Sequence, residues 1–162
     1  MRMIPKKVFF TSGVGKHEDK LVSFELALRD AGIEKCNLVK VSSVLPPNCE
    51  FVDREEGLKE LKSGEIVFVV MSEISSKEEG EKIIASLACA YPKDRKHRGY
   101  IAEYCCKNKS EKEARKKAEE IATLMLTSLI NLKEVGKISI SNSTIVEKGK
   151  WSTVIAAAVF IL

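Results

Sequence analysis

Two apolar runs constrain the fold of this 162-residue chain most strongly. Residues 66–71 (Ile-Val-Phe-Val-Val-Met) are six consecutive apolar side chains, which is typical of a strand that is buried on both faces. Residues 151–162 form a second apolar strand, and Ala156-Ala157-Ala158 within it predict close packing against a neighbour. Because such strands need cover on both faces, the two runs predict a layered fold with strands at its centre.

Shorter patterns predict five further strands, over residues 7–11, 37–41, 82–91, 99–105 and 137–145. The pattern of residues 82–91 fits a helix or a strand, and Pro92 with the turn-like residues 93–96 favours a strand in a hairpin. We expect a turn over residues 12–15 and a connection over residues 75–81. Residues 51–64 are charged and irregular, with one helical turn expected near residues 56–61.

Two longer segments have helical spacing. Apolar side chains recur through residues 18–31, and Gly32 supplies a C-terminal stop. A capping box of Ser110 and Glu113 opens a second helix, which we expect to reach about residue 132. Two sheet layers with helices outside are the economical arrangement of these elements, so the predicted class is α+β. With no repeat or linker, residues 1–162 are expected to form a single domain, whose strand order stays open.

Charge and cysteine content exclude several functions. The net charge is only +4 and aromatic residues make up 6% of the chain, whereas nucleic-acid binders show a stronger, clustered basic excess. The five cysteines lack the spacing of a zinc site, so we expect no metal and free thiols in a reducing cytoplasm. The apolar runs at either end are too short for a signal peptide or a membrane span, and no membrane partner is expected.

One loop offers unusual chemistry. Ser42 and Ser43 end an apolar strand and stand before Pro46-Pro47, which stiffens the chain after them. A serine hydroxyl held beside the preceding peptide carbonyl can attack it, and elimination from the resulting ester, followed by loss of ammonia, leaves an N-terminal pyruvoyl group. Ser43 is the candidate precursor. The pattern alone also fits an ordinary polar turn.

A second candidate is Glu103, the one carboxylate in an otherwise apolar strand, residues 99–105. Burial would raise the pKa of Glu103 and keep it protonated near neutral pH, which suits a proton donor. The competing interpretation is a carboxylate on the solvent face of an edge strand.

Taken together, these motifs resemble the pyruvoyl-dependent arginine decarboxylases of archaea and some bacteria. The resemblance is carried by Ser-Ser-x-x-Pro-Pro at residues 42–47 and Gly-x-Ile-x-Glu-Tyr at residues 99–104. It extends through residues 31–33, 37–39 and 90–94, and also through the helix after Ser110 and the alanine-rich last strand, so that it covers nearly the whole chain.

The resemblance implies a proenzyme that cuts itself between Ser42 and Ser43, giving chains 1–42 and 43–162. It implies an αββα sandwich with two antiparallel-rich sheets face to face, assembled as a trimer of such pairs or a multiple of it, with active sites between protomers. The cofactor would be the pyruvoyl group from Ser43, with no pyridoxal phosphate (PLP). The group would form a Schiff base with arginine, and the products would be CO2 and agmatine, a polyamine precursor.

The resemblance also implies roles for three further residues. Glu103 stands where the family has its proposed proton donor, and Asn37 matches an active-site asparagine. Glu25 stands where a family member has an aspartate facing the substrate's guanidinium, and its side chain is one methylene longer. Two alternatives therefore stay open: the same chemistry on another amino acid, or a binding or assembly module that is never processed.

Overall fold

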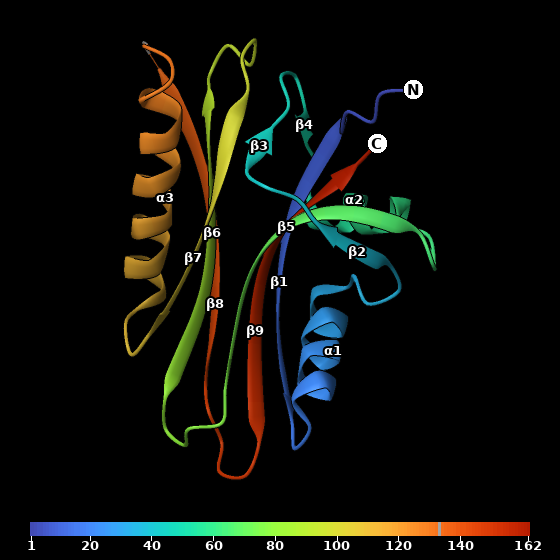
Figure 1. The fold of residues 1–162 in the computed structure, drawn as a ribbon, viewed down its shortest axis with the longest axis vertical. Helices are drawn as coiled ribbons and strands as arrows, with labels where there is room; N and C mark the ends of the chain where they lie inside the picture. Colours follow the sequence, from blue (N-terminus) through green and yellow to red (C-terminus); the bar gives the residue numbers. More distant parts are fainter. Residues whose placement is uncertain (133) are drawn as a thin grey trace.

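The computed structural model describes residues 1–132 and 134–162, and it places them in two β-sheets that pack face to face (Figure 1). The predicted α+β class and the sandwich of two antiparallel-rich sheets are confirmed. The strands are β1 (Lys7–His17), β2 (Asn37–Lys40), β3 (Val44–Leu45), β4 (Glu50–Phe51), β5 (Ile66–Ser76), β6 (Lys82–Pro92), β7 (Gly99–Lys107), β8 (Val135–Ile145) and β9 (Trp151–Ile161). The helices are α1 (Lys20–Ala31), α2 (Arg54–Glu60) and α3 (Glu111–Thr127).

The two apolar runs lie inside the same sheet. This five-stranded sheet has the order β2-β5-β9-β1-β4, and β9 pairs antiparallel with both β1 and β5. The other sheet has the order β3-β7-β6-β8 and is antiparallel throughout. Residues 82–91 therefore belong to a strand, as the proline and turn after them predicted.

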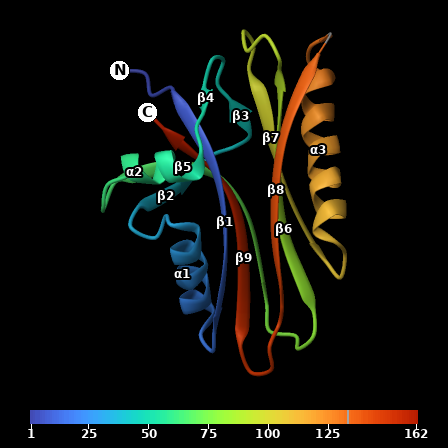
Figure 2. The same ribbon diagram turned by 180° about the vertical axis from the view of Figure 1, so that it is seen from behind.

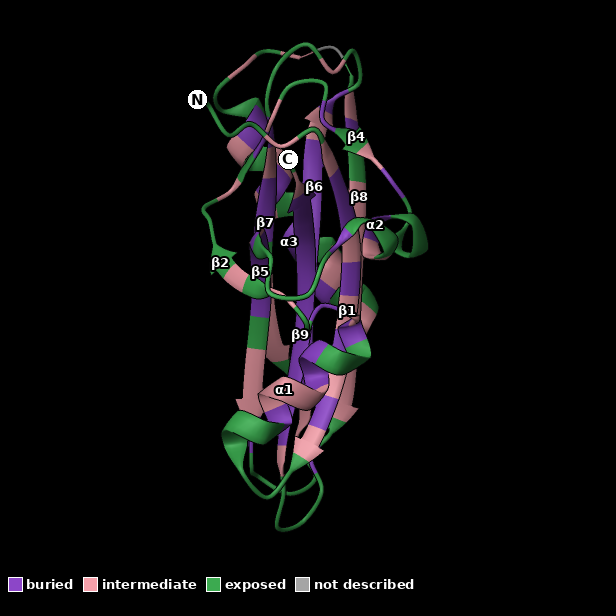
Figure 3. Cartoon of the chain, turned by 90° about the vertical axis from the view of Figure 1, so that its right-hand side faces the viewer, coloured by how far each residue is buried: buried purple, intermediate pink, exposed green. Residues whose placement is uncertain are grey.

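Apolar side chains fill three layers between these elements. The central layer lies between the sheets, where Val70 and Ala156 face Leu87. Helices α1 and α2 cover the outer face of the five-stranded sheet, and α3 covers the outer face of the four-stranded sheet (Figures 1 and 2). Figure 3 shows β6 and β9 buried almost along their whole length. The helices thus lie on the outside of both sheets, as the αββα arrangement requires.

The predicted turn over residues 12–15 is wrong, because β1 continues through it to His17. The glycines there serve helix packing: a Cβ on Gly13 would lie 2.1 Å from the Ala27 carbonyl oxygen, and one on Gly15 would lie 2.0 Å from that of Ser23. Glycine lets α1 lie directly on the strand, and this close approach has the same sequence signal as a turn.

Three other segments differ clearly from the sequence prediction, and β2, β7 and β8 differ from it by one or two residues at one end. Residues 54–60 form a helix of seven residues, α2, rather than a single turn, and Asp53 caps it by accepting a hydrogen bond from the Glu56 amide. Strand β5 extends through Ser76, since its last residues still pair with β9. Helix α3 ends at Thr127 rather than near residue 132, and Leu132 packs against the apolar cluster between α3 and the four-stranded sheet.

The predicted helix ends are otherwise confirmed. Ser110 and Glu113 exchange both hydrogen bonds of a capping box, and Gly32 ends α1 with a φ of 81°. The two chain ends lie at the same end of the five-stranded sheet (Figure 1), where the Lys6 amide donates to the Ile161 carbonyl at 2.8 Å. In the part of the chain that the structure describes, no helix is both long and apolar enough to cross a membrane.

Candidate active site

The peptide bond between Ser42 and Ser43 lies where the chain passes from one sheet to the other. On one side, the Val41 amide donates to the Val69 carbonyl of β5 at 2.9 Å. On the other side, the Ser43 carbonyl accepts from the Ile101 amide of β7 at 2.7 Å. The bond is therefore held from both ends by strands of different sheets, which limits its movement relative to either.

The residues after Ser43 continue this attachment to the four-stranded sheet. Val44 and Leu45 pair with Tyr100 and Gly99 as the short strand β3, and the Leu45 side chain is buried between the sheets. Pro46 follows at once, so the chain downstream of the candidate cleavage point is as stiff as the two prolines predicted.

Arg95 fixes the far end of this loop. Its guanidinium lies 4.3 Å from the ring centre of Phe51 and 5.1 Å from that of Tyr91, and it donates to the Cys49 carbonyl. The Asn48 amide in turn donates to the Arg95 carbonyl at 3.0 Å. The arginine thus joins the loop before β4 to the turn between β6 and β7, a role for which the sequence carries no recognisable signal.

Replacing Arg95 with methionine should lower the free energy of unfolding by about 1–3 kcal/mol, because it removes stacking on two rings and a charge-assisted hydrogen bond. Urea denaturation of the two proteins measures the difference. Arg98→Met is the matched control, since that guanidinium lies over one ring only, 5.8 Å from the centre of Tyr100. Equal losses in the two variants would contradict a special role for Arg95.

Glu103 lies two residues beyond Ile101 on β7, and its side chain is on the face toward the other sheet. Its partner on β6 is Leu87, a residue of the central layer. Because successive residues of a strand rise about 3.3 Å, Glu103 is about 7 Å along β7 from the amide that holds Ser43. The structure therefore brings Glu103 and Ser43 to the same region of the molecule.

Both sequence interpretations of Glu103 describe part of its surroundings. The residue is exposed, as expected at the edge of the sheet, since β3 covers only the start of β7. Partial burial of the carboxyl nevertheless raises the pKa of Glu103, while the positive charge of Lys40 acts in the opposite direction. A carboxyl group with a raised pKa can hold a proton closer to neutral pH.

Lys40 is a member of the site that sequence reasoning missed. It ends β2, three residues before Ser43, and its Nζ atom lies 3.3 Å from the Glu73 carboxylate of β5. Nothing in the sequence distinguishes it from other surface lysines, and only the pairing of β2 with β5 brings it near Glu103. On the other side of Glu103, Cys105 is joined to Ser72 of β5 by a 3.0 Å hydrogen bond.

Asn37 lies at the opposite end of β2 from the cleavage point. Its side-chain amide donates to the Gly64 carbonyl at 3.1 Å, and it lines a small cavity beneath α1 together with Phe24 and Lys40. Glu25 lies on α1, half-buried, where it pairs with Arg29 at 3.1 Å. Within one chain, therefore, neither residue contacts Ser43 in the way that Ile101 does.

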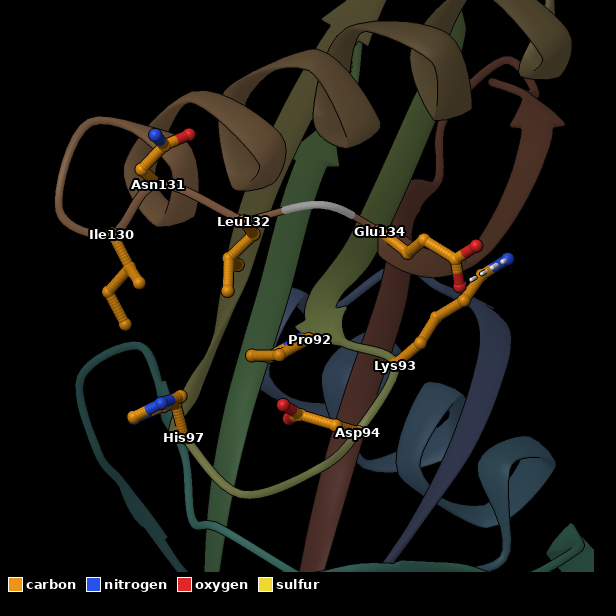
Figure 4. A pocket seen from close by; sticks show the side chains of 8 residues that line it. All are labelled: Pro92, Lys93, Asp94, His97, Ile130, Asn131, Leu132 and Glu134. Carbon is orange, nitrogen blue, oxygen red and sulfur yellow. Dashed lines mark ion pairs between the residues drawn. The ribbon is translucent and has the colours of Figure 1, made fainter.

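An apolar pocket of about 260 Å³ lies beside Ser42. It is walled by the segment before β1, by the end of β9 and by β5, with Phe68, Phe160 and Leu162 among the lining residues. A larger hollow, of about 420 Å³, lies between the turn after β6 and the residues that follow α3 (Figure 4). Its Lys93–Glu134 ion pair at 4.0 Å faces solvent, and none of Ser42, Ser43 or Glu103 lines it.

The five cysteines are free thiols. Among residues 1–132 and 134–162, no three His, Cys, Asp or Glu side chains come together as ligands for a metal ion. For a cofactor built from the chain itself, the fitting feature is Ser43, which carries the required hydroxyl and whose main chain is held on both sides.

The held main chain of Ser43, with a carboxyl group of raised pKa on the neighbouring strand β7, agrees with the self-made cofactor that the sequence resemblance implies. Residues 7–162 match the family described as "Pyruvoyl-dependent arginine decarboxylase". The chain therefore belongs to the pyruvoyl-dependent arginine decarboxylase family.

Several relatives match over their full length. "Pyruvoyl-dependent arginine decarboxylase 1" of Methanosarcina acetivorans is 53% identical over 162 residues, covering 99% of this chain and 98% of the relative. The protein of the same name from Archaeoglobus fulgidus is 51% identical, covering 99% and 100%. A "Probable pyruvoyl-dependent arginine decarboxylase" of Chlorobaculum tepidum is 42% identical, covering 99% of each.

Proposed function

We propose that this chain cuts itself between Ser42 and Ser43 and then decarboxylates L-arginine to agmatine and CO2. The observation that best supports this is the attachment of the Ser43 carbonyl to Ile101, two residues from Glu103. The names and full-length similarity of the relatives support arginine as the substrate.

The chain's own residues suit the cutting step. The hydrogen bonds of Val41 and Ser43 hold the backbone on either side of the bond, so the Ser43 hydroxyl needs only a side-chain rotation to approach the Ser42 carbonyl. Strands β1 and β2 would then belong to chain 1–42, and the other strands to chain 43–162.

In the mature enzyme the pyruvoyl group supplies an electron-accepting carbonyl, the role that PLP has in other decarboxylases. Glu103 holds the proton that replaces the departing carboxylate, and its raised pKa favours the protonated form. The ammonium of Lys40 faces the same region and would attract the substrate's carboxylate to it.

Recognition of the guanidinium is assigned to Glu25 of a second copy of the chain. Within one protomer Glu25 lies on α1, outside the five-stranded sheet, whereas Ser43 lies between the edges of the two sheets. Apolar side chains are exposed around the cleavage loop, at Val39, Val41 and Val44, which suits an interface between copies. A trimer, or a multiple of it, is the proposed assembly, and the cytoplasm is the proposed compartment, on the support of five free thiols.

The mass spectrum of the denatured protein tests the self-cutting. We expect two chains, residues 1–42 and 43–162, the second lighter by one NH3 than a chain that begins with serine. An intact chain with unmodified Ser43 would instead support a module that is never processed.

A second measurement tests the substrate. CO2 release from arginine should exceed release from lysine, ornithine, histidine and aspartate, because Glu25 can pair with a guanidinium through two parallel hydrogen bonds. Faster release from another amino acid would assign the same chemistry to that substrate. Purified, fully cut protein serves for all five assays.

A further inference from the structure

The pocket beside Ser42 is lined by the residue whose carbonyl the Ser43 hydroxyl would attack during self-cutting. Ser42 lines this pocket, and after attack by the Ser43 hydroxyl the Ser42 carbonyl becomes part of an ester. We infer that the apolar wall of the pocket keeps water from this ester, so that the chain ends in a pyruvoyl group rather than a serine. The inference rests on the proposed self-cutting.

The ester can react in two ways, which differ in the carbon atom that water attacks. When it forms, the Ser43 oxygen bonds to the Ser42 carbonyl carbon, the peptide C–N bond breaks and the hydroxyl proton passes to the amine. If water attacks the same carbonyl carbon, the ester opens to a Ser42 carboxylate and a free N-terminal Ser43, and no cofactor is made.

In the reaction that gives the pyruvoyl group, water does not attack the Ser42 carbonyl. Residue 43 loses its Cα proton, its Cβ–O bond breaks and Ser42 leaves as a carboxylate, which gives dehydroalanine. Dehydroalanine rearranges to an imine, water adds to the imine carbon and NH3 departs, which leaves the pyruvoyl group. Which reaction occurs therefore depends on keeping water away from the Ser42 carbonyl until the Cβ–O bond has broken.

The composition of the pocket suits this task. Apart from Ser42, every residue that lines it is apolar, including Met3, Phe68 and Leu162. An ordered water needs two to four polar partners, and apart from Ser42 the side chains of this wall offer neither such partners nor a base to activate a water. The pocket volume of about 260 Å³ is large enough for water, so the exclusion of water depends on the apolar lining and not on the size of the pocket.

Main-chain hydrogen bonds hold the segment before β1, which forms part of the apolar wall of the pocket. The Lys6 carbonyl accepts from the Glu50 amide at 2.7 Å, and the Lys6 amide donates to Ile161, so the segment with Met3 is tied to β4 and β9. Met3 is 59% exposed and Leu162 is 50% exposed, whereas Phe160 belongs to the buried core. Met3 and Leu162 can therefore be changed with little cost to the fold.

The test compares Leu162→Asn and Met3→Gln with the unchanged protein and with Leu124→Asn. Leu124 is 67% exposed on α3 and does not line the pocket, so it is a matched leucine control. Intact-mass spectrometry of each cut protein gives the ratio of serine-ended to pyruvoyl-ended chain 43–162. Native mass of the same samples reports the assembly.

We expect the serine-ended share to rise several-fold in Leu162→Asn and Met3→Gln at unaltered assembly, and to stay at the unchanged protein's value in Leu124→Asn. If both pocket variants gave only pyruvoyl-ended chains, the inference would be overturned, and the proposed function would be unaffected. The inference would also be overturned if the serine-ended share rose only in variants whose assembly is altered. The same holds if this share rose equally in Leu124→Asn. An uncut unchanged protein would defeat the proposed function itself.

Discussion

Replacing Ser43 with alanine should leave a single uncut chain of 18.0 kDa, because the side chain that attacks the Ser42 carbonyl is gone. Processing should fall below detection, and decarboxylation with it, since Ser43 is the proposed source of the cofactor. Denaturing electrophoresis with intact-mass spectrometry measures the outcome. If the alanine variant still splits at this bond, Ser43 is not the attacking residue.

Ser42→Ala is the matched control for this experiment. Ser42 contributes its carbonyl to the reaction, and its exposed side chain precedes the bond that is cut. The Ser42 variant should therefore give the same two chains as the unchanged protein. The main-chain hydrogen bonds of Val41 and Ser43 are available in both variants, so a difference between them reports the hydroxyl of Ser43 alone.

Replacing Glu103 with glutamine should leave self-cutting intact and reduce turnover by about 10²–10⁴-fold, the usual contribution of a general acid. Glutamine keeps the size of the side chain but cannot give up a proton at neutral pH. CO2 release from arginine, measured on fully cut protein, gives the effect. Glu134→Gln, in the solvent-facing hollow of Figure 4, should release CO2 at the unchanged rate.

The pH profile separates a proton donor from a residue that only supports the fold. A donor must be protonated, so turnover should fall as pH rises through the pKa of Glu103, which partial burial places above that of an ordinary glutamate. The charge of Lys40 lowers the same pKa, so Lys40→Gln should move this fall to higher pH. Full activity of Glu103→Gln would remove the residue from the mechanism.

The sequence predicted the layers of the fold better than the lengths of its strands. Continuous apolar residues in β5 and β9 reveal burial on both faces, and this alone requires cover by other layers. The glycines of β1 led to the wrong prediction of a turn, because a missing Cβ permits a turn and close helix packing equally well. Strands β3 and β4, with two residues each, are too short to show any period.

For the candidate site, the sequence draws attention to two residues of possible chemistry and gives no sign of the residues that support them. Ser43 and Glu103 stand out because a hydroxyl beside prolines and a carboxylate in an apolar strand are locally unusual. Arg95 lies in a charged turn and Lys40 ends the short strand β2, and their hydrogen-bond partners are 46 and 33 residues away in the chain. Only the pairing of β2 with β5, and the stacking on Phe51, makes them part of this region.

The crossing of the chain between its two sheets has a consequence for refolding. In a chain cut at Ser42, strand β1 of the smaller piece still lies between β9 and β4, and β2 still pairs with β5 of the larger piece. The pieces stay together while the fold persists, but unfolding releases two separate molecules. Refolding then becomes a bimolecular reaction that slows on dilution, whereas the uncut precursor refolds at a rate independent of concentration.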